Sequence, residues 1–279
     1  MRFDAGYLPL PLLARHAGRD WPSSLLALLV AGRLDELRAW YDATGGVAPR
    51  ELAADVVPFA AARPAPLYRR PRKIWGIGLN YRDHAADLSE QAPTAEPASF
   101  LKPDTSIIGP GEAIRIPRLS QRTTGEAELG LIFGRTCRDV PRERWREVVA
   151  GFCPILDMTA EDILRRNPRN LTQSKSFDTF FSFGPEFVTT DEVPDVNALV
   201  VRTIHNGRVH AENTVARMTF PPDQLVAYHS QIMTLLPGDI LSTGTPGAAP
   251  LAHGDTVACR IDGFPELSNP VIDLKQTPS

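Results

Sequence analysis

The sequence predicts an α+β, β-rich fold, in which a body of short strands carries a few helices. Twenty-six prolines in 279 residues disfavour long helical bundles and favour short strands joined by shaped loops. From residue 73 onward the apolar residues fall mostly into short strand-like runs, whereas the first 70 residues show helical spacing. We therefore expect a small accessory domain with a linker at 1–70 and a main domain at 71–279.

The N-terminal 70 residues contain three candidate helices. Ser24 is placed to cap a helix over 25–32, which Gly32 would end. Apolar residues at helical spacing predict a second helix over 34–41, and a third follows at 49–55. The stretch 61–72 is rich in proline and arginine, which is typical of a linker, although its basic run could also serve as a binding arm.

The main domain mixes strands with a few helices. The Asn206-Gly207 pair suits positive φ and predicts a type I′ turn between strands at 199–205 and 208–214. Other patterns predict a buried strand at 73–78, strands that follow Gly-Asp at 238–239 and 254–255, and helices at 83–89, 142–150 and 222–236.

Composition excludes several classes of function. A net charge of −3 gives no electrostatic case for binding nucleic acid or an anionic membrane. The three cysteines lack metal-type spacing and are typical of reduced thiols in the cytosol. The N-terminus has no secretory pattern, and the longest apolar run, 25–31, is far too short to span a bilayer. We expect a cytoplasmic protein without nucleic-acid or membrane partners.

Two carboxylates, Glu126 and Glu128, lie one residue apart at the start of an apolar run. In a strand, the period of two would direct both to the same face, where like charges repel. A divalent cation between them would remove that repulsion, so the pair is a candidate for two thirds of a metal site. The alternative is an edge strand whose acids are solvated.

Asp157 is the best candidate for a third oxygen ligand. It ends the apolar run 152–156, where a carboxylate is expected to be partly buried and therefore to need a partner. Its position before a helical pattern at 159–164 equally allows it to cap that helix. The local sequence does not decide between ligand and cap.

Three further features could take part in catalysis. His84 and Asp87 would share one helix face, and a carboxylate beside an imidazole orients it as a general base, although surface helices often contain this pattern. Lys175 lies among phenylalanines and could extend to solvent or bind an anionic substrate. The loop at 243–247 offers backbone amides for a carboxylate, or is simply a turn.

Taken together, these residues resemble the fumarylacetoacetate hydrolase family. Nine motifs occur in the family's order and extend over about residues 72–275, and the first 70 residues resemble the small variable domain of many members. The motifs lie at 78–85, 97–102, 126–129, 157–160, 175–178, 184–185, 206–207, 237–239 and 243–246. The resemblance implies a catalytic domain built as a mixed β-sandwich or roll, preceded by a small N-terminal α/β domain.

The resemblance also implies roles for individual residues. Glu126, Glu128 and Asp157 match the ligands of Mg²⁺, Mn²⁺ or Ca²⁺, and the metal would polarise the substrate carbonyl and stabilise an enolate. His84 and Asp87 match the pair that activates water or transfers a proton, and Lys175 matches a lysine that stabilises an oxyanion. The implied substrate contacts are Arg82, Lys102 and Thr245.

The sequence departs from the family pattern at four positions. Asp87 replaces the usual glutamate, and Thr124 stands where an aspartate is common. Glu161 and Leu164 occupy the usual arginine and glutamine positions after Asp157. The loss of a cation and an amide near a metal ligand indicates a substrate pocket different from the common acylpyruvate type.

The expected function is metal-dependent hydrolysis of a C–C bond in a β-diketo or acylpyruvate-like acid. Alternatives on the same site are decarboxylation of a 2-oxo acid and isomerisation of a 2-hydroxydienoate. A different class, a ligand-binding member without catalysis, is supported only by the departures at Glu161 and Leu164. By the same resemblance, the expected partners are a small oxo acid and a second copy of the chain in a homodimer.

Overall fold

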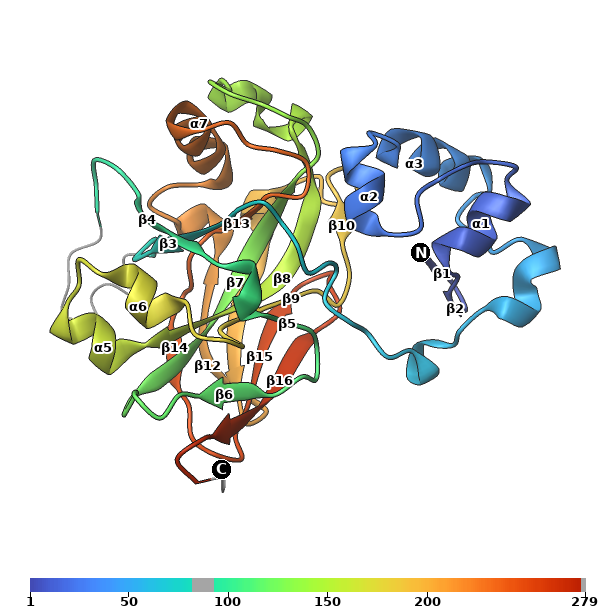
Figure 1. Cartoon of the computed structure of the whole chain (residues 1–279). Helices are drawn as coiled ribbons and strands as arrows, with labels where there is room; N and C mark the ends of the chain where they lie inside the picture. The colour runs from blue at the N-terminus through green and yellow to red at the C-terminus, as the bar shows by residue number, and fades with distance from the viewer. Residues whose placement is uncertain (82–92, 277–279) are drawn as a thin grey trace. The chain divides into compact units, whose positions relative to one another are not determined.

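The computed structural model describes residues 1–81 and 93–276. The chain divides into two compact units, Met1–Pro64 and Ala65–Ser279. Their labelled elements are shown in Figure 1. The helix expected at 83–89 lies outside the described residues.

The first unit consists of short helices and a small hairpin. As expected, Ser24 caps the second helix, where its Oγ accepts a hydrogen bond from the backbone N–H of Ala27 at 3.3 Å. Two small apolar clusters form its interior, one around Trp21 and Leu28 and one around Phe3 and Leu13. Its elements are β1 (Arg2–Phe3), β2 (Gly6–Tyr7), α1 (Leu10–His16), α2 (Leu25–Val30), α3 (Leu34–Ala43) and the 3-10 helices η1 (Arg50–Asp55) and η2 (Phe59–Ala61).

The second unit is built on a large mixed sheet, of nine strands within the described residues. Its strand order is β4-β3-β13-β7-β8-β9-β5, with β14 paired to β7 and β10 to β8. The two long central strands, β7 (Thr123–Phe133) and β8 (Val149–Ala160), are antiparallel along their whole length. The others are β3 (Ile74–Gly78), β4 (Ala98–Lys102), β5 (Ile107–Ile108), β9 (Phe181–Phe183), β10 (Val188–Thr189), β13 (Ile240–Ser242) and β14 (Ala248–Pro250).

A second sheet packs against the first. Its order is β12-β11-β15-β16-β6, from β6 (Ile114–Ile116), β11 (Val200–His205), β12 (Arg208–Thr214), β15 (Thr256–Ile261) and β16 (Leu267–Asp273). The expected type I′ turn joins β11 and β12, since Asn206 and Gly207 have φ of 49° and 76°. The two sheets confirm the β-rich α+β fold.

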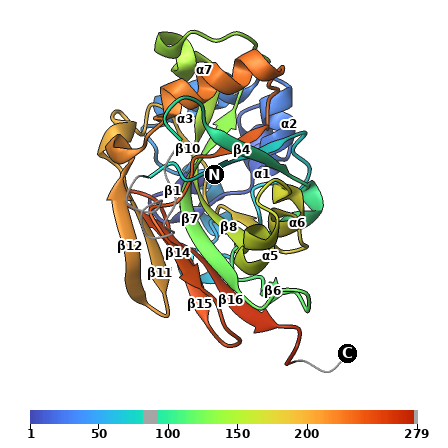
Figure 2. The same cartoon turned by 90° about the vertical axis from the view of Figure 1, so that its left-hand side faces the viewer.

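Alternation along β7 determines which residues enter the space between the sheets. Ala127, Leu129 and Leu131 belong to the main apolar core, together with Val201 and Val257 of the second sheet. The intervening residues of β7 therefore face the other side of the large sheet. On that side lie α5 (Glu161–Arg166) and α6 (Leu171–Lys175), as Figure 2 shows.

Two helices are shorter than expected because the residues at their C-terminal ends pair with other strands or segments instead. Within the expected range 142–150, only Arg142–Glu147 is helical, as the 3-10 helix η4, and Val149 then begins β8 opposite Phe133. Helix α7 (Pro222–Ile232) ends before the expected residue 236, because Leu235 forms a bridge with Cys137. The remaining 3-10 helices are η3 (Asp104–Ser106), η5 (Val196–Ala198) and η6 (Val215–Arg217).

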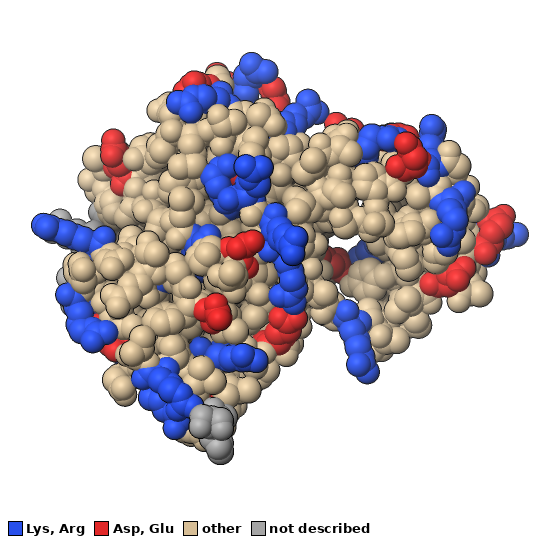
Figure 3. Space-filling model, in the orientation of Figure 1, with Lys and Arg blue, Asp and Glu red and all other residues tan. Residues whose placement is uncertain are grey.

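The surface carries charges of both signs. On the face drawn in Figure 3, basic and acidic side chains are interspersed. Among the described residues, no helix has the length and apolar character needed to cross a membrane.

Candidate metal centre

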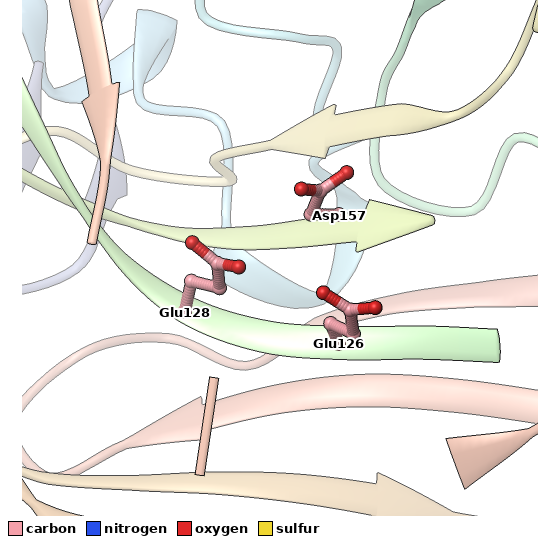
Figure 4. Close-up of side chains that lie close together, drawn as sticks. All are labelled: Glu126, Glu128 and Asp157. Atoms are coloured by element: carbon pink, nitrogen blue, oxygen red, sulfur yellow. The ribbon is translucent and has the colours of Figure 1, made fainter. Parts of the chain in front are cut away.

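Three carboxylates meet on the face of the large sheet that carries α6. Glu126 and Glu128 come from β7, and Asp157 of β8 lies directly opposite Glu126. Each contributes a carboxylate oxygen that lies within 4.8 Å of those from the other two. In Figure 4 the three side chains rise from the same side of the two ribbons. We call these residues the acidic triad.

The structure decides both questions that the local sequence left open. The solvated-edge interpretation is wrong, because β7 has strands on both sides and Glu128 is only 1% exposed. The capping interpretation of Asp157 is also wrong, because β8 continues through Ala160 and α5 begins at Glu161. Asp157 thus lies within a strand, fully buried, with its carboxylate beside two others.

Neutral donors hold two of the carboxylates in place. The Thr159 hydroxyl donates to Glu126 Oε1 at 2.5 Å. The Ser242 hydroxyl and the backbone N–H of Gly244 both donate to Glu128 Oε2, at 2.5 and 2.7 Å. Ser242 lies outside the nine sequence motifs, and Thr159 and Gly244 lie within them without having been assigned to the triad. A usable signal for Thr159 was its place two residues after Asp157, on the same strand face.

Two buried lysines complete the site. Lys102 Nζ donates to Asp157 Oδ1 at 2.5 Å. Lys175 Nζ donates to Asp157 Oδ2 and to Glu126 Oε2, both at 3.0 Å. Lys175 therefore does not extend to solvent, and Lys102, expected to contact substrate, is bound to a carboxylate of the triad. With all five groups ionised, the three carboxylates and two ammonium groups would carry one negative charge in excess.

The electrostatics of the site indicate that it suits a cation. Burial, and then the charges of Asp157 and Glu126, raise the pKa of Glu128 to about 8. Burial lowers the pKa of Lys102 despite its pairing with Asp157. For Lys175, burial opposes the charged form, but Asp157, Glu126 and Glu128 outweigh it and raise the pKa above its usual value. An added divalent charge would favour the ionised form of Glu128.

The donor set fits a hard divalent metal. Carboxylate oxygens are the ligands that Mg²⁺, Mn²⁺ and Ca²⁺ prefer. Two oxygens bound to one Ca²⁺ can be up to about 5 Å apart, and two bound to one Mg²⁺ up to about 4.2 Å. The triad oxygens, within 4.8 Å of one another, are therefore spaced as two oxygens around one Ca²⁺ can be, and the smaller Mg²⁺ would require them to move closer together.

The loop after β13 lies against the triad. Its Gly244 N–H binds a carboxylate, as the sequence allowed, but the carboxylate is that of Glu128 rather than that of a substrate. The Thr245 hydroxyl hydrogen bonds with the backbone of Gly247, which donates from its N–H at 3.2 Å and accepts at its carbonyl at 3.1 Å. The role of Thr245 in substrate binding stays a prediction.

At the end of β8, Glu161 takes part in an ion-pair cluster. Its buried carboxylate accepts a hydrogen bond from Arg122 Nε at 2.6 Å and another from Arg165. Arg122 directly precedes β7, so the strand opposite supplies a cation that the sequence lacks at position 161. Two arginines therefore pair with the acid that stands at position 161. Leu164, the other departure, lies in α5 and is partly exposed.

The remaining predicted site residues, Arg82, His84 and Asp87, lie outside the described residues. The described chain ends just before them at Tyr81 and resumes at Pro93, ahead of β4. Their predicted roles remain predictions.

The sequence was compared with family models and with known proteins, and it matches members of one family. The family model described as fumarylacetoacetate (FAA) hydrolase, C-terminal, matches residues 73–272. An uncharacterized protein of Pyrococcus abyssi is 39% identical over 207 residues, which are 73% of this chain and 91% of that protein. The residues matched by the family model span most of the second unit.

Solved structures of related enzymes share the fold. A 5-carboxymethyl-2-hydroxymuconate delta-isomerase from Mycobacterium smegmatis is 36% identical with a TM-score of 0.70, covering 78% of this chain and 84% of that one. Maleylpyruvate hydrolase from Sphingobium sp. SYK-6 is 28% identical with a TM-score of 0.75, covering 94% and 92%. The same hydrolase is also known in complex with manganese(II) ion and pyruvate.

The extent of these matches identifies the family. The family model covers most of the chain, including β7, β8 and all three acids of the triad. Members with known structures include both a hydrolase and an isomerase. The chain belongs to the fumarylacetoacetate hydrolase family.

Proposed function

We propose that the protein is a divalent-metal-dependent hydrolase that cleaves a C–C bond in a β-diketo or acylpyruvate-like acid. The observation that carries the proposal is the acidic triad, buried and bordered by the two lysine ammonium groups. Maleylpyruvate hydrolase supports hydrolysis in particular, because its similarity extends over 94% of this chain. Its manganese and pyruvate complex supports a metal with a 2-oxo acid as ligand.

Glu126, Glu128 and Asp157 would hold the ion, as Mg²⁺, Mn²⁺ or Ca²⁺. When bound, it supplies Lewis-acid polarisation of the oxygens of a 2-oxo acid and stabilises the enolate that leaves. Thr159, Ser242 and Gly244 keep two of the carboxylates oriented. Fixed donors of this kind avoid reorganisation during the reaction.

Lys175 would stabilise negative charge that develops on the substrate. Its Nζ lies 3.0 Å from oxygens of two triad acids, so its ammonium group is next to any ligand of the site. Buried in a site of low dielectric constant, an ammonium group interacts more strongly with an oxyanion than it would in water. His84, oriented by Asp87, would take a proton from the attacking water.

Turnover of β-diketo acids is expected to depend on both the metal and His84. We expect EDTA to abolish it and His84→Ala to lower kcat by about 10²–10⁴-fold, the usual contribution of general acid–base catalysis. Steady-state assays with a panel of diketo acids, before and after EDTA, measure both effects. His16→Ala, an exposed histidine of α1, is the control. Undiminished turnover after EDTA or in His84→Ala would rule out this mechanism.

Isomerisation of a 2-hydroxydienoate is a second candidate, supported by the muconate isomerase at 36% identity. Decarboxylation is the third candidate: in a 2-oxo acid with a second carboxylate β to the oxo group, loss of that carboxylate as CO₂ would use the same polarisation of the oxo group by the ion. The products separate the three reactions: hydrolysis yields two acids, decarboxylation releases CO₂, and isomerisation preserves mass. Mass spectrometry of the products assigns the reaction.

We also propose that the protein acts as a homodimer, on the strength of the family resemblance. Sedimentation equilibrium is expected to give twice the chain mass of 30.6 kDa. A single species at the chain mass over the concentration range of the assay would contradict this.

A further inference from the structure

Asn80 forms a hydrogen-bonded junction between three segments that are distant in sequence. It follows β3 and is 1% exposed. Its Nδ2 donates to Phe220 O at 3.0 Å and to Thr243 O at 2.7 Å, and its Oδ1 accepts from Phe220 N at 2.9 Å. This amide orientation pairs every bond, whereas the flipped one would place Oδ1 against two carbonyl oxygens. Asn80 therefore fixes the loop after β13 to the end of β3.

One of these bonds leads directly to the triad. The carbonyl of Thr243 and the N–H of Gly244 belong to the same planar peptide group. The carbonyl accepts from Asn80 Nδ2, and the N–H donates to Glu128 Oε2 at 2.7 Å. A hydrogen bond on one side of a peptide polarises the group and strengthens the bond on the other side. Asn80 is therefore linked to Glu128 through one rigid unit.

The backbone on both sides of this link is held in unusual conformations. Leu79 has φ of +54° and Gly244 has φ of +94°. A Cβ added at Gly244 would lie 2.8 Å from Asn80 Cβ, so only glycine permits the close approach. A positive φ at a branched residue such as Leu79 costs about 1–3 kcal/mol and persists only where the surroundings enforce it. These surroundings include the bonds of Asn80.

We propose that Asn80 is a positioning residue of the metal centre, which sets the orientation of Glu128 through the peptide group between Thr243 and Gly244. Its amide hydrogen bonds with backbone groups of Phe220 and Thr243, so it would act on the metal through Glu128. Without its amide, this peptide can rotate, and Glu128 Oε2 keeps only the Ser242 hydroxyl as a fixed donor. The inference rests on the metal-binding part of the proposed function, and does not depend on which reaction the enzyme catalyses.

The chain offers a matched control for removing this amide. Asn269 of β16 is fully buried, and its Nδ2 also donates to two backbone carbonyls, those of Gly109 at 2.7 Å and Glu112 at 2.8 Å. Asn80→Ala and Asn269→Ala therefore each delete two bonds from a side-chain amide to backbone carbonyls, and Asn80→Ala also removes the bond that Phe220 N donates. Loss of metal affinity in the first variant alone cannot come from general destabilisation.

The test is isothermal titration with Mn²⁺, at a temperature well below the unfolding midpoint of each variant. We expect Asn80→Ala to weaken Mn²⁺ binding by about tenfold, the lower end of the effect of outer groups on metal affinity. We expect Asn269→Ala to bind Mn²⁺ as the wild type does. If Asn80→Ala does not fold, Asn80→Ser, which adds no charge beside the triad, replaces it.

A double-mutant cycle locates the effect at Glu128. Asn80→Ala and Ser242→Ala both act on Glu128 Oε2, so their effects on Mn²⁺ affinity should be non-additive. Asn80→Ala and Thr159→Val should be additive, because Thr159 holds Glu126. Wild-type affinity in the Asn80 variants, or equal losses in Asn80→Ala and Asn269→Ala, would overturn the proposal. Failure of the wild type to bind Mn²⁺ would overturn the metal site itself.

Discussion

Asp157→Asn is expected to lower affinity for Mn²⁺ by more than about 100-fold and to abolish turnover. The carboxylate lies opposite Glu126 and supplies one of the three closely placed oxygens. Loss of a direct ligand should exceed the 10–100-fold effect typical of groups behind the ligands. Mn²⁺ titration and assays at saturating metal measure the two effects.

Asp239→Asn is the matched control for this substitution. Asp239 is also fully buried and pairs with a lysine, since Lys73 Nζ lies 2.6 Å from its carboxylate. Breaking a buried ion pair by removing one partner costs about 3–5 kcal/mol, so both variants should unfold at lower temperature. Only Asp157→Asn should lose Mn²⁺ binding. Equal affinity in the two variants would show that Asp157 is not a ligand.

Lys175→Met is expected to reduce kcat by about 10²–10³-fold, comparable to the removal of one oxyanion donor. Metal affinity should be kept or increase, because the substitution removes a positive charge beside two ligands. The opposite directions of these two effects separate a role in charge stabilisation from a role in metal binding. Steady-state kinetics at saturating metal and Mn²⁺ titration report them independently.

Lys73→Met serves as the control, because Lys73 also pairs with a buried aspartate, and that aspartate, Asp239, is not part of the acidic triad. It should leave kcat and Mn²⁺ affinity unchanged. Unchanged kcat in Lys175→Met, or a parallel loss of kcat and Mn²⁺ affinity, would contradict the proposed role of Lys175.

Local signals identified much of the fold. The Asn206-Gly207 turn, the cap at Ser24 and the strand after residue 73 all formed as expected, because neighbouring residues alone determine them. The range 142–150 failed for the opposite reason. Arg142–Glu147 is helical, as the spacing of its residues predicts. Val149 instead pairs with Phe133 in the sheet, a contact that depends on a distant part of the chain.

The candidate site shows the same division. The family pattern located the triad, Lys102 and Lys175, whose identity and order are explicit in the chain. It gave no sign that Lys102 would bind Asp157, or that Ser242 and Gly244 would hold Glu128. These contacts join segments up to 116 residues apart, so local patterns carry no information about them.

By itself, the sequence determined the β-rich α+β fold class, the family and the placement of Glu126 and Glu128 on one strand face. The physical reason is that alternation along a strand depends only on residue spacing. Only the tertiary structure decided that Asp157 is no helix cap, because the register of β7 against β8 sets it opposite Glu126. The burial that raises the pKa of Glu128 also arises only when β7, β8, β13 and the loop after β13 come together from distant parts of the chain.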